Sequence, residues 1–456
     1  MWHFEEPYLN DMKPIRFWLA SSGLALAMGH AVAGDSGHAY SLQKAIDIAL
    51  SNNPELHIMQ ARIAQADAQL GEALSSFYPQ IKTSLAYQHS NNPAQAFAMI
   101  IAQRRLDMSG SSSQFNYPGF VDNYRPQVTA SYSLFRGGQD YFNSQAAELN
   151  RESLELETHA ARNRLINHVT SAYYSELAAR DADRVSLRAI EAVSSELKQS
   201  QAGFQAGSTL KSDVLSLEVQ LAETQDAQIH AHNAVEIAHS MLRTLMGVEV
   251  TEHFDLQAEQ QALPDLPAEL SVLLDQALDQ HPELKAAEKR VAIAEQQLSA
   301  AQAAHLPRAD AMISYGSDSK NISYSSNRDN MTAAVVVEMD LFSGFATQEK
   351  IHQAEHQLTA AQEQARQLRL TVEDQLKSAR LRLQETLNRF AISLSASKAA
   401  EEALRLVTLQ RQAGTVTITR FLEAQVAFDK ALNRQINARF EALRAEADLK
   451  QAMGSW

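Results

Sequence analysis

Apolar residues recur along this chain with two different periods, which predict two kinds of element. From residue 141 to 205, and again from 347 to 411, small and apolar residues return every three or four positions, with almost no Gly or Pro between them. That spacing is typical of a helix face packed in a coiled coil. At 1.5 Å per residue each helix would be about 95 Å long, far more than a compact core requires.

The second period is two, and it predicts short strands. Apolar residues alternate with other residues in two stretches of the first half, 81–87 and 128–134, and in one stretch of the second half, 311–315, after which 331–342 would form the return strand. Such alternation indicates strands with one face unlike the other. The connections at 90–124 and 318–330 are rich in Asn and Ser, so we expect polar loops there.

The chain also repeats itself. Asn53-Pro54-Glu55-Leu56 returns as His281-Pro282-Glu283-Leu284 at an offset of 228, and Gln205-Ala206-Gly207 returns as Gln412-Ala413-Gly414 at an offset of 207. The first copy therefore carries 21 extra residues between its two strands. Turn residues keep register as well as helical ones, which favours an internal duplication over chance similarity between Ala-rich helices.

The repeat predicts the domain organisation. Each copy would contain short helices, a β-hairpin and a long helical hairpin. Repeat 1 would span 41–247, with its β-hairpin at about 80–135 and its helical hairpin at about 139–246. After a linker at 248–268, repeat 2 would span 269–454, with the corresponding hairpins at about 309–342 and 345–453.

The N-terminal region has the pattern of a signal peptide at residues 12–33. Lys13 and Arg16 precede a mostly apolar run, and Ala31-Val32-Ala33 fits a cleavage site. Residues 1–11 would be an upstream extension or reflect a misassigned start. A membrane anchor is the alternative, but the run falls short of the roughly 20 residues that a span needs.

Composition and charge narrow the function classes. The net charge of −14 argues against a nucleic-acid partner, and the absence of Cys excludes disulfides and thiol chemistry. We find no phosphate loop, nucleophile elbow or Rossmann glycine pattern, so we expect no enzyme and no cofactor. His352 and His356 have the spacing of a metal pair but lack an acidic partner, and we predict no metal site.

Four strands per chain are too few to close a barrel, and an open sheet in lipid would leave its edges without hydrogen-bond partners. Closure becomes possible when chains pool their strands. Three copies would supply twelve, within the range of transmembrane barrels. The fold class expected is mainly α with β: long antiparallel coiled-coil hairpins, plus four strands given to a trimeric 12-stranded transmembrane β-barrel.

These features resemble the TolC-like outer-membrane factors, over residues 41–454. The resemblance rests on the duplication, the repeated Asn/His-Pro-Glu-Leu motif, Leu134-Phe135-Arg136-Gly137-Gly138 and the two Gly-centred tips. The second copy departs from the pattern, with Leu341-Phe342-Ser343-Gly344-Phe345. The resemblance implies a homotrimeric outer-membrane channel of a Gram-negative bacterium that extends into the periplasm. It would be the passive exit duct of a tripartite efflux pump or type I secretion system, surrounded by outer-membrane lipid.

The same resemblance implies two sets of functional residues. A periplasmic adaptor would dock on the helical tips at Gly207, Ser208, Gly414 and Thr415, and an inner-membrane pump or ABC transporter would complete the assembly. At the periplasmic entrance Glu423 would form an acidic ring, while Asp213 would pair with Arg411 or Arg420. The alternative for the tips is that they are ordinary helix turns. The alternative for the charged residues is that they are solvated side chains on a helix surface.

Two other functions stay open on the sequence alone. A soluble periplasmic coiled-coil scaffold or adaptor would use the strands in a small β domain, although adaptors usually have one helical hairpin. An enzyme using the His pairs would contain bound metal. The cargo, the pump and the resting state of the duct are not encoded in any recognisable pattern.

Overall fold

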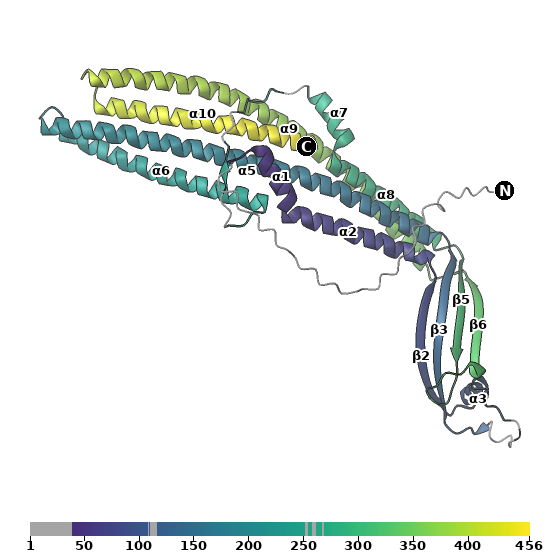
Figure 1. The fold of residues 1–456 in the computed structure, drawn as a ribbon. Coiled ribbons are helices and arrows are strands. Elements are labelled where there is room, and N and C mark those ends of the chain that lie inside the picture. The colour runs from purple at the N-terminus through teal and green to yellow at the C-terminus, as the bar shows by residue number, and fades with distance from the viewer. Residues whose placement is uncertain (1–38, 108, 110–115, 251–253, 258–260, 267–268) are drawn as a thin grey trace. The chain divides into compact units, whose positions relative to one another are not determined.

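A computed structural model gives the fold (Figure 1). It describes residues 39–456 except 108, 110–115, 251–253, 258–260 and 267–268. The segment 12–33, interpreted as a signal peptide, lies outside the described residues.

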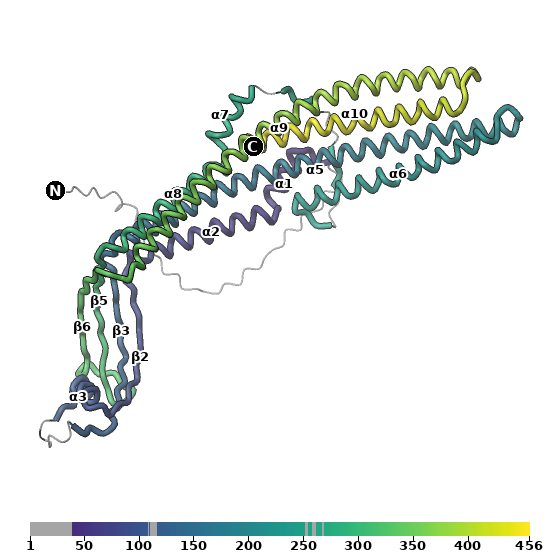
Figure 2. Tube along the Cα trace, turned by 180° about the vertical axis from the view of Figure 1, so that it is seen from behind, coloured from purple at the N-terminus to yellow at the C-terminus, as the bar shows by residue number. Residues whose placement is uncertain are grey.

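Four long helices dominate the chain. The outgoing helices are α5 (Gln139–Gln205) and α9 (Ala346–Gln412), and each has 67 residues. The returning helices are α6 (Lys211–Met246) and α10 (Ile418–Ala452). Helix α5 packs against α6 and α10, and α10 packs against α9, so two helical hairpins lie side by side (Figure 2). The helices expected at 141–205 and 347–411 are confirmed to within two residues.

Among the described residues, four shorter helices pack against the long ones. Helices α1 (Leu42–Asn52) and α2 (Pro54–Leu74) pack on α5, and α8 (Pro282–Ala303) packs on α5 and α9, whereas α7 (Leu270–Gln280) packs mainly on α9. Pro54 and Pro282 occupy the first turns of α2 and α8, where a missing N–H costs no helical hydrogen bond. Helices α1 and α7 therefore end just before these two Pro residues.

The strands form one four-stranded sheet. Its members are β2 (Gln80–Ser90), β3 (Val121–Arg136), β5 (Arg308–Ser317) and β6 (Asp329–Glu338), all antiparallel, in the order β2-β3-β5-β6. The pairing of β3 with β5 joins the two hairpins, with a bulge between Ser133 and Phe135. Outside this sheet, β1 (Ala39–Tyr40) pairs in parallel with β4 (Asp255–Leu256).

The register gives the sheet two unlike faces. Across the four strands Ile81 aligns with Ala130, Ile313 and Ala333, whereas the neighbouring row aligns Lys82 with Thr129, Ser314 and Thr332. Aligned residues share a face, so one face is mainly apolar and the other mainly polar. The large side chains of the apolar face are exposed, Ile81 at 73% and Val335 at 66%. No element in the described part of the chain covers that face.

The long connection between β2 and β3 differs from the expected polar loop. Residues Pro93–Ala102 form helix α3, which begins after Asn92, whose side-chain oxygen accepts from the backbone N–H of Ala94 and Gln95. Ala96 and Met99 are buried in the loop region. The Asn-Pro start is a regular helix cap, and the Asn and Ser content of the surrounding segment obscured it.

Three apolar clusters hold the helices together. The largest joins α1, α5, α6 and α10 around Tyr173, Leu242 and Met246. A second lies where both helical hairpins turn, and a third packs α7 on α9 and α10 through Leu273, Leu376 and Leu449. Each fully buried Leu in such a cluster contributes about 1.5–3 kcal/mol. Within the described segments, no helix combines the length and apolar character needed to cross a membrane.

Candidate functional site

The two helical tips have the same backbone geometry. Gly207 and Gly414 adopt left-handed conformations, with φ of +77° and +72°. The next residue closes each turn: Ser208 N–H donates to the carbonyl of Gly203 at 2.8 Å, and Thr415 N–H donates to that of Gln410 at 2.9 Å. Both turns are Schellman-type ends, which place Gly at the left-handed position. The four tip residues singled out in the sequence thus occupy matching turns.

A small apolar core lies directly behind the tips. It combines residues from all four long helices: Val193, Leu197, Val214, Leu217, Val407, Ile418 and Phe421. Thr417 caps α10 by accepting the N–H of Arg420 at 3.4 Å, which fixes the helix start just after the turn. The two tips are therefore held against each other within one chain.

Arg411 lies near the end of α9, and its ion-pair partner is on the other hairpin. Arg411 Nε donates to Glu196 Oε1 at 2.9 Å, and the two side chains are 23% and 12% exposed. The ion pair joins α9 to α5. Sequence reasoning selected Arg411 but expected Asp213 as its partner and missed Glu196. The position equivalent to Arg411 in the first half is Phe204, so the repeat gave no signal for this pair.

The other entrance candidates lie on the surface. Arg420 donates to Glu423 within the same helix at 3.2 Å, with side chains 63% and 60% exposed. Asp213, in the first turn of α6, forms no ion pair among the described residues of this one chain. The expected pairing of Asp213 with Arg411 or Arg420 is absent within the protomer. A contact between protomers, and the ring of Glu423, stay predictions.

Apolar side chains are also exposed around the tips. Leu210 is 69% exposed, immediately after the first turn, and Leu215 and Leu409 are each 50% exposed. Single exposed apolar side chains are common on protein surfaces, so these three alone do not define a binding surface.

Metal-binding groups do not assemble in the described part of the chain. No cluster of three or more His, Cys, Asp or Glu side chains has the geometry to hold an ion there. His352 contacts Gln348 at 3.1 Å on the surface of α9. His239 instead faces the carboxylate of Glu176, 3.2 Å away.

Comparison with known proteins identifies the family. The family model for outer membrane efflux proteins matches residues 45–248 and 273–455, most of the chain. This chain belongs to that family.

Several known proteins match this chain over most of its length. The chain is 26% identical to the protein CyaE of Bordetella pertussis over 368 residues, covering 80% of this chain and 71% of CyaE. It is 22% identical to the outer membrane protein TolC of Escherichia coli over 449 residues, covering 95% and 86%. The crystal structure of the Campylobacter jejuni CmeC outer membrane channel shares the fold, with a TM-score of 0.79 at 15% identity, covering 91% of this chain and 85% of CmeC.

Family membership fixes the location of this outer membrane efflux protein and its broad class. It is an outer-membrane protein that extends into the periplasm, and its family is one of channels rather than of enzymes. The resemblance to TolC-like proteins, inferred from motifs, is confirmed.

Proposed function

We propose that this protein is a homotrimeric outer-membrane channel whose strands pool into a 12-stranded barrel. In this proposal it is the passive exit duct of a tripartite efflux pump or type I secretion system. Its two halves arose by duplication, with repeats at 41–247 and 269–454, and residues 12–33 act as the signal peptide.

The observation that carries the proposal is the incomplete sheet. Among the described strands, β2 and β6 each have one partner, so both outer edges of the four-stranded sheet are open. Its apolar face is uncovered as well. In a membrane, unpaired strand edges cost several kcal/mol per polar group, whereas pairing β6 of one copy with β2 of the next removes every edge. The apolar face would then meet lipid and the polar face would line the duct.

The helical hairpins support the second part of the proposal. Two helical hairpins from each protomer would continue the duct into the periplasm, and the exposed apolar residues near the tips would be covered by neighbouring protomers and by a periplasmic adaptor. The tip residues Gly207, Ser208, Gly414 and Thr415 are proposed as the adaptor-docking surface. An inner-membrane pump or ABC transporter would supply the energy.

At the periplasmic entrance, we assign Glu423 to a pore-facing acidic ring and Arg411 to the contact between hairpins. Three copies of a carboxylate around one axis create a negative potential that favours cations. Asp213 and Arg420 would form an ion pair between protomers, because Asp213 forms no ion pair among the described residues of one chain.

Crosslinking between the open strand edges tests this assembly. The chain has no native Cys, so introduced thiols react without background. One Cys at Ser84 on β2 would be combined in turn with Cys at Asn330, Thr332 or Ala334 on β6, all on the polar face. We expect at least one combination to give covalent dimers and trimers and nothing larger.

The matched control places the first Cys at Thr129, which is flanked inside the sheet by Lys82 and Ser314. This variant should give no crosslink between chains. If the whole scan yields no trimer, or if crosslinks grow beyond trimers, the shared barrel is wrong. A soluble coiled-coil scaffold would then be the better description.

A further inference from the structure

The two returning helices each end against the start of a short helix, and the two joints are built differently. At the first joint, the end of α6 meets the start of α2. Gly247 lies so close to Asn52 that an added Cβ would be 2.6 Å from its carbonyl oxygen. At the second joint, the end of α10 meets the start of α8, and a Cβ on Gly454 would be 2.9 Å from Pro282 Cδ. Both joints are close-packed.

A single side chain fastens the first joint. Asn53 Oδ1 accepts the N–H of Glu55 at 2.8 Å and so caps α2, while its Nδ2 donates to the carbonyl of Leu245 in α6 at 2.8 Å. Asn53 is 7% exposed. Its amide group therefore pairs with one backbone N–H at the start of α2 and one backbone carbonyl at the end of α6. Backbone groups at helix ends lack partners within their own helix, so both hydrogen bonds satisfy groups that would otherwise be unpaired.

His281 takes the place of Asn53 at the second joint. It is equally buried, at 7% exposure, yet it makes no side-chain cap to α8. Its Nδ1 is buried and has no hydrogen-bond partner among the described residues. A side chain of α5 takes over part of the task, because Asn163 Nδ2 donates to the carbonyl of Gly454 at 2.9 Å. Among the described residues, no hydrogen bond joins the imidazole to either helix end.

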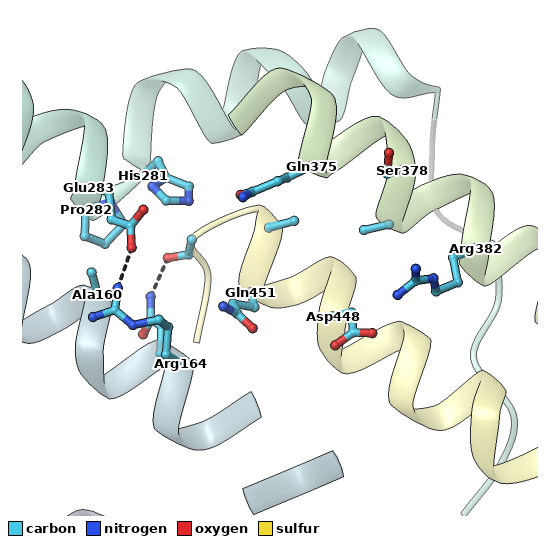
Figure 3. A pocket seen from close by; sticks show the side chains of 14 residues that line it. Ala160, Arg164, His281, Pro282, Glu283, Gln375, Ser378, Arg382, Asp448 and Gln451 are labelled. Atoms are coloured by element: carbon cyan, nitrogen blue, oxygen red, sulfur yellow. Dashed lines mark hydrogen bonds and ion pairs between the residues drawn. The ribbon is translucent and has the colours of Figure 1, made fainter. Parts of the chain in front are cut away.

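The second joint also opens into a cavity of about 410 Å³ (Figure 3). The titratable side chains around it come from every helix that packs there: Arg164 of α5, Glu283 of α8, Arg382 of α9 and Asp448 of α10. Glu283 already accepts from Arg164, and Asp448 accepts from Asn167 at 3.0 Å. Each nearby carboxylate therefore has a donor before any charge is placed on His281.

Burial lowers the pKa of His281, and the nearby charge of Glu283 offsets this only in part. The His281 ring, which has no hydrogen bond at Nδ1, is thus kept neutral while the joint stays packed. Below the ordinary His pKa of about 6.5, a ring exposed to water would take up a proton that the packed ring resists. Acidification must then favour conformations in which His281 reaches water, because proton binding is linked to opening.

We propose that the joint between α10 and α8 is a pH-responsive joint, held closed while His281 is neutral and loosened when His281 takes up a proton. The joint between α6 and α2, fastened by the non-titrating Asn53, does not respond. Since α9 and α10 continue from this region to the second tip, acidification would loosen the hold on one helical hairpin and leave the other in place. This inference goes beyond the proposed export function and does not depend on it.

Hydrogen exchange measured by mass spectrometry on the full-length protein compares the two joints in one molecule. The matched peptides are 50–64 and 278–292, which contain equivalent helix starts. After correction for intrinsic exchange rates, we expect protection of 278–292 to fall by about threefold or more between pH 7.5 and pH 5.5 relative to 50–64. Equal changes in the two peptides would overturn the proposal.

Two reciprocal variants separate His281 from general acid effects. His281→Asn introduces the side chain that fastens the first joint, and it should remove the extra pH dependence of 278–292. Asn53→His should create a matching pH dependence in 50–64. His57→Asn, which replaces an exposed His in the first peptide, is the control and should change neither. If His281→Asn keeps the wild-type pH dependence, His281 is not the group responsible. The oligomer mass in the same samples reports separately on the proposed trimer.

Discussion

Arg411 near the end of α9 donates from Nε to Oε1 of Glu196 on α5, across 2.9 Å. The two residues are 215 positions apart in sequence and belong to different helical hairpins. Both side chains are mostly buried beside the apolar core behind the tips. The pair therefore ties the two hairpins together inside each protomer, close to the proposed periplasmic entrance.

Removing this ion pair should weaken the contact between the two helical hairpins and lower the stability of the protein. We expect Arg411→Ala and Glu196→Gln each to cost about 1–3 kcal/mol, because a largely buried charged hydrogen bond is lost and its partner is left unsatisfied. A double-mutant cycle measured by denaturant unfolding would give the coupling energy.

The matched control is the exposed pair of Arg405 with Glu402, 2.8 Å apart on α9, with side chains 58% and 55% exposed. Disrupting that pair should cost less than about 1 kcal/mol. A coupling energy near zero for Arg411 and Glu196 would show that the contact does not hold the hairpins.

Charge at Glu423 should set ion selectivity. Glu423→Gln should lower the preference for cations in the purified channel, measured as the reversal potential in a planar bilayer under a salt gradient. Arg420→Ala should raise that preference, because Arg420 pairs with Glu423 at 3.2 Å and offsets its charge. The control Glu402→Gln should have little effect. An unchanged reversal potential in Glu423→Gln would rule out the acidic ring.

Glycines at the tips and at the first joint should differ in their tolerance of a side chain. At Gly207 the built Cβ has open space around it, so Gly207→Ala should cost only the strain of a left-handed residue, about 1–2 kcal/mol. At Gly247 the Cβ would also meet the carbonyl of Asn52 at 2.6 Å, so Gly247→Ala should destabilise more. Thermal unfolding of the two variants tests the order, and equal losses would contradict the close approach at the joint.

Asp429 provides a test of pH dependence. Burial raises the pKa of this α10 carboxyl, and hydrogen bonds from Gln425 Nε2 at 3.0 and 3.2 Å oppose the shift. A folded-state pKa above the unfolded value means that the ionised form weakens folding at neutral pH and that this penalty disappears as the pH falls. Asp429→Asn should therefore raise the Tm at pH 7.5 and have a smaller effect at pH 4.5. An equal change at both values would exclude this cause.

Much of the fold follows from local patterns in the sequence. The long helices and the strands have strong periods, and the Pro residues that begin α2 and α8 set element boundaries that the structure shares. Helix α3 was missed because its apolar turns lie in a segment rich in Asn and Ser. Local composition outweighed a short but regular helix signal there.

The candidate site was harder to predict, for a physical reason. The glycines at 207 and 414 could be placed because a left-handed turn demands that residue type. The partner of Arg411 could not, because Glu196 is set beside it by the packing of two hairpins. Similarly, the contrast between Asn53 and His281 becomes informative only when their neighbours in α6 and α10 are known.

The central claim is that three copies share one barrel in the outer membrane. The most direct measurement is the detergent-corrected mass of the protein extracted from separated inner and outer membranes. The account predicts three times the mass of the mature chain, recovered from the outer membrane only with detergent. A monomer or dimer released without detergent would contradict it. The edges of β2 and β6 would then not be paired between three copies, and the strands would not form a barrel in the membrane.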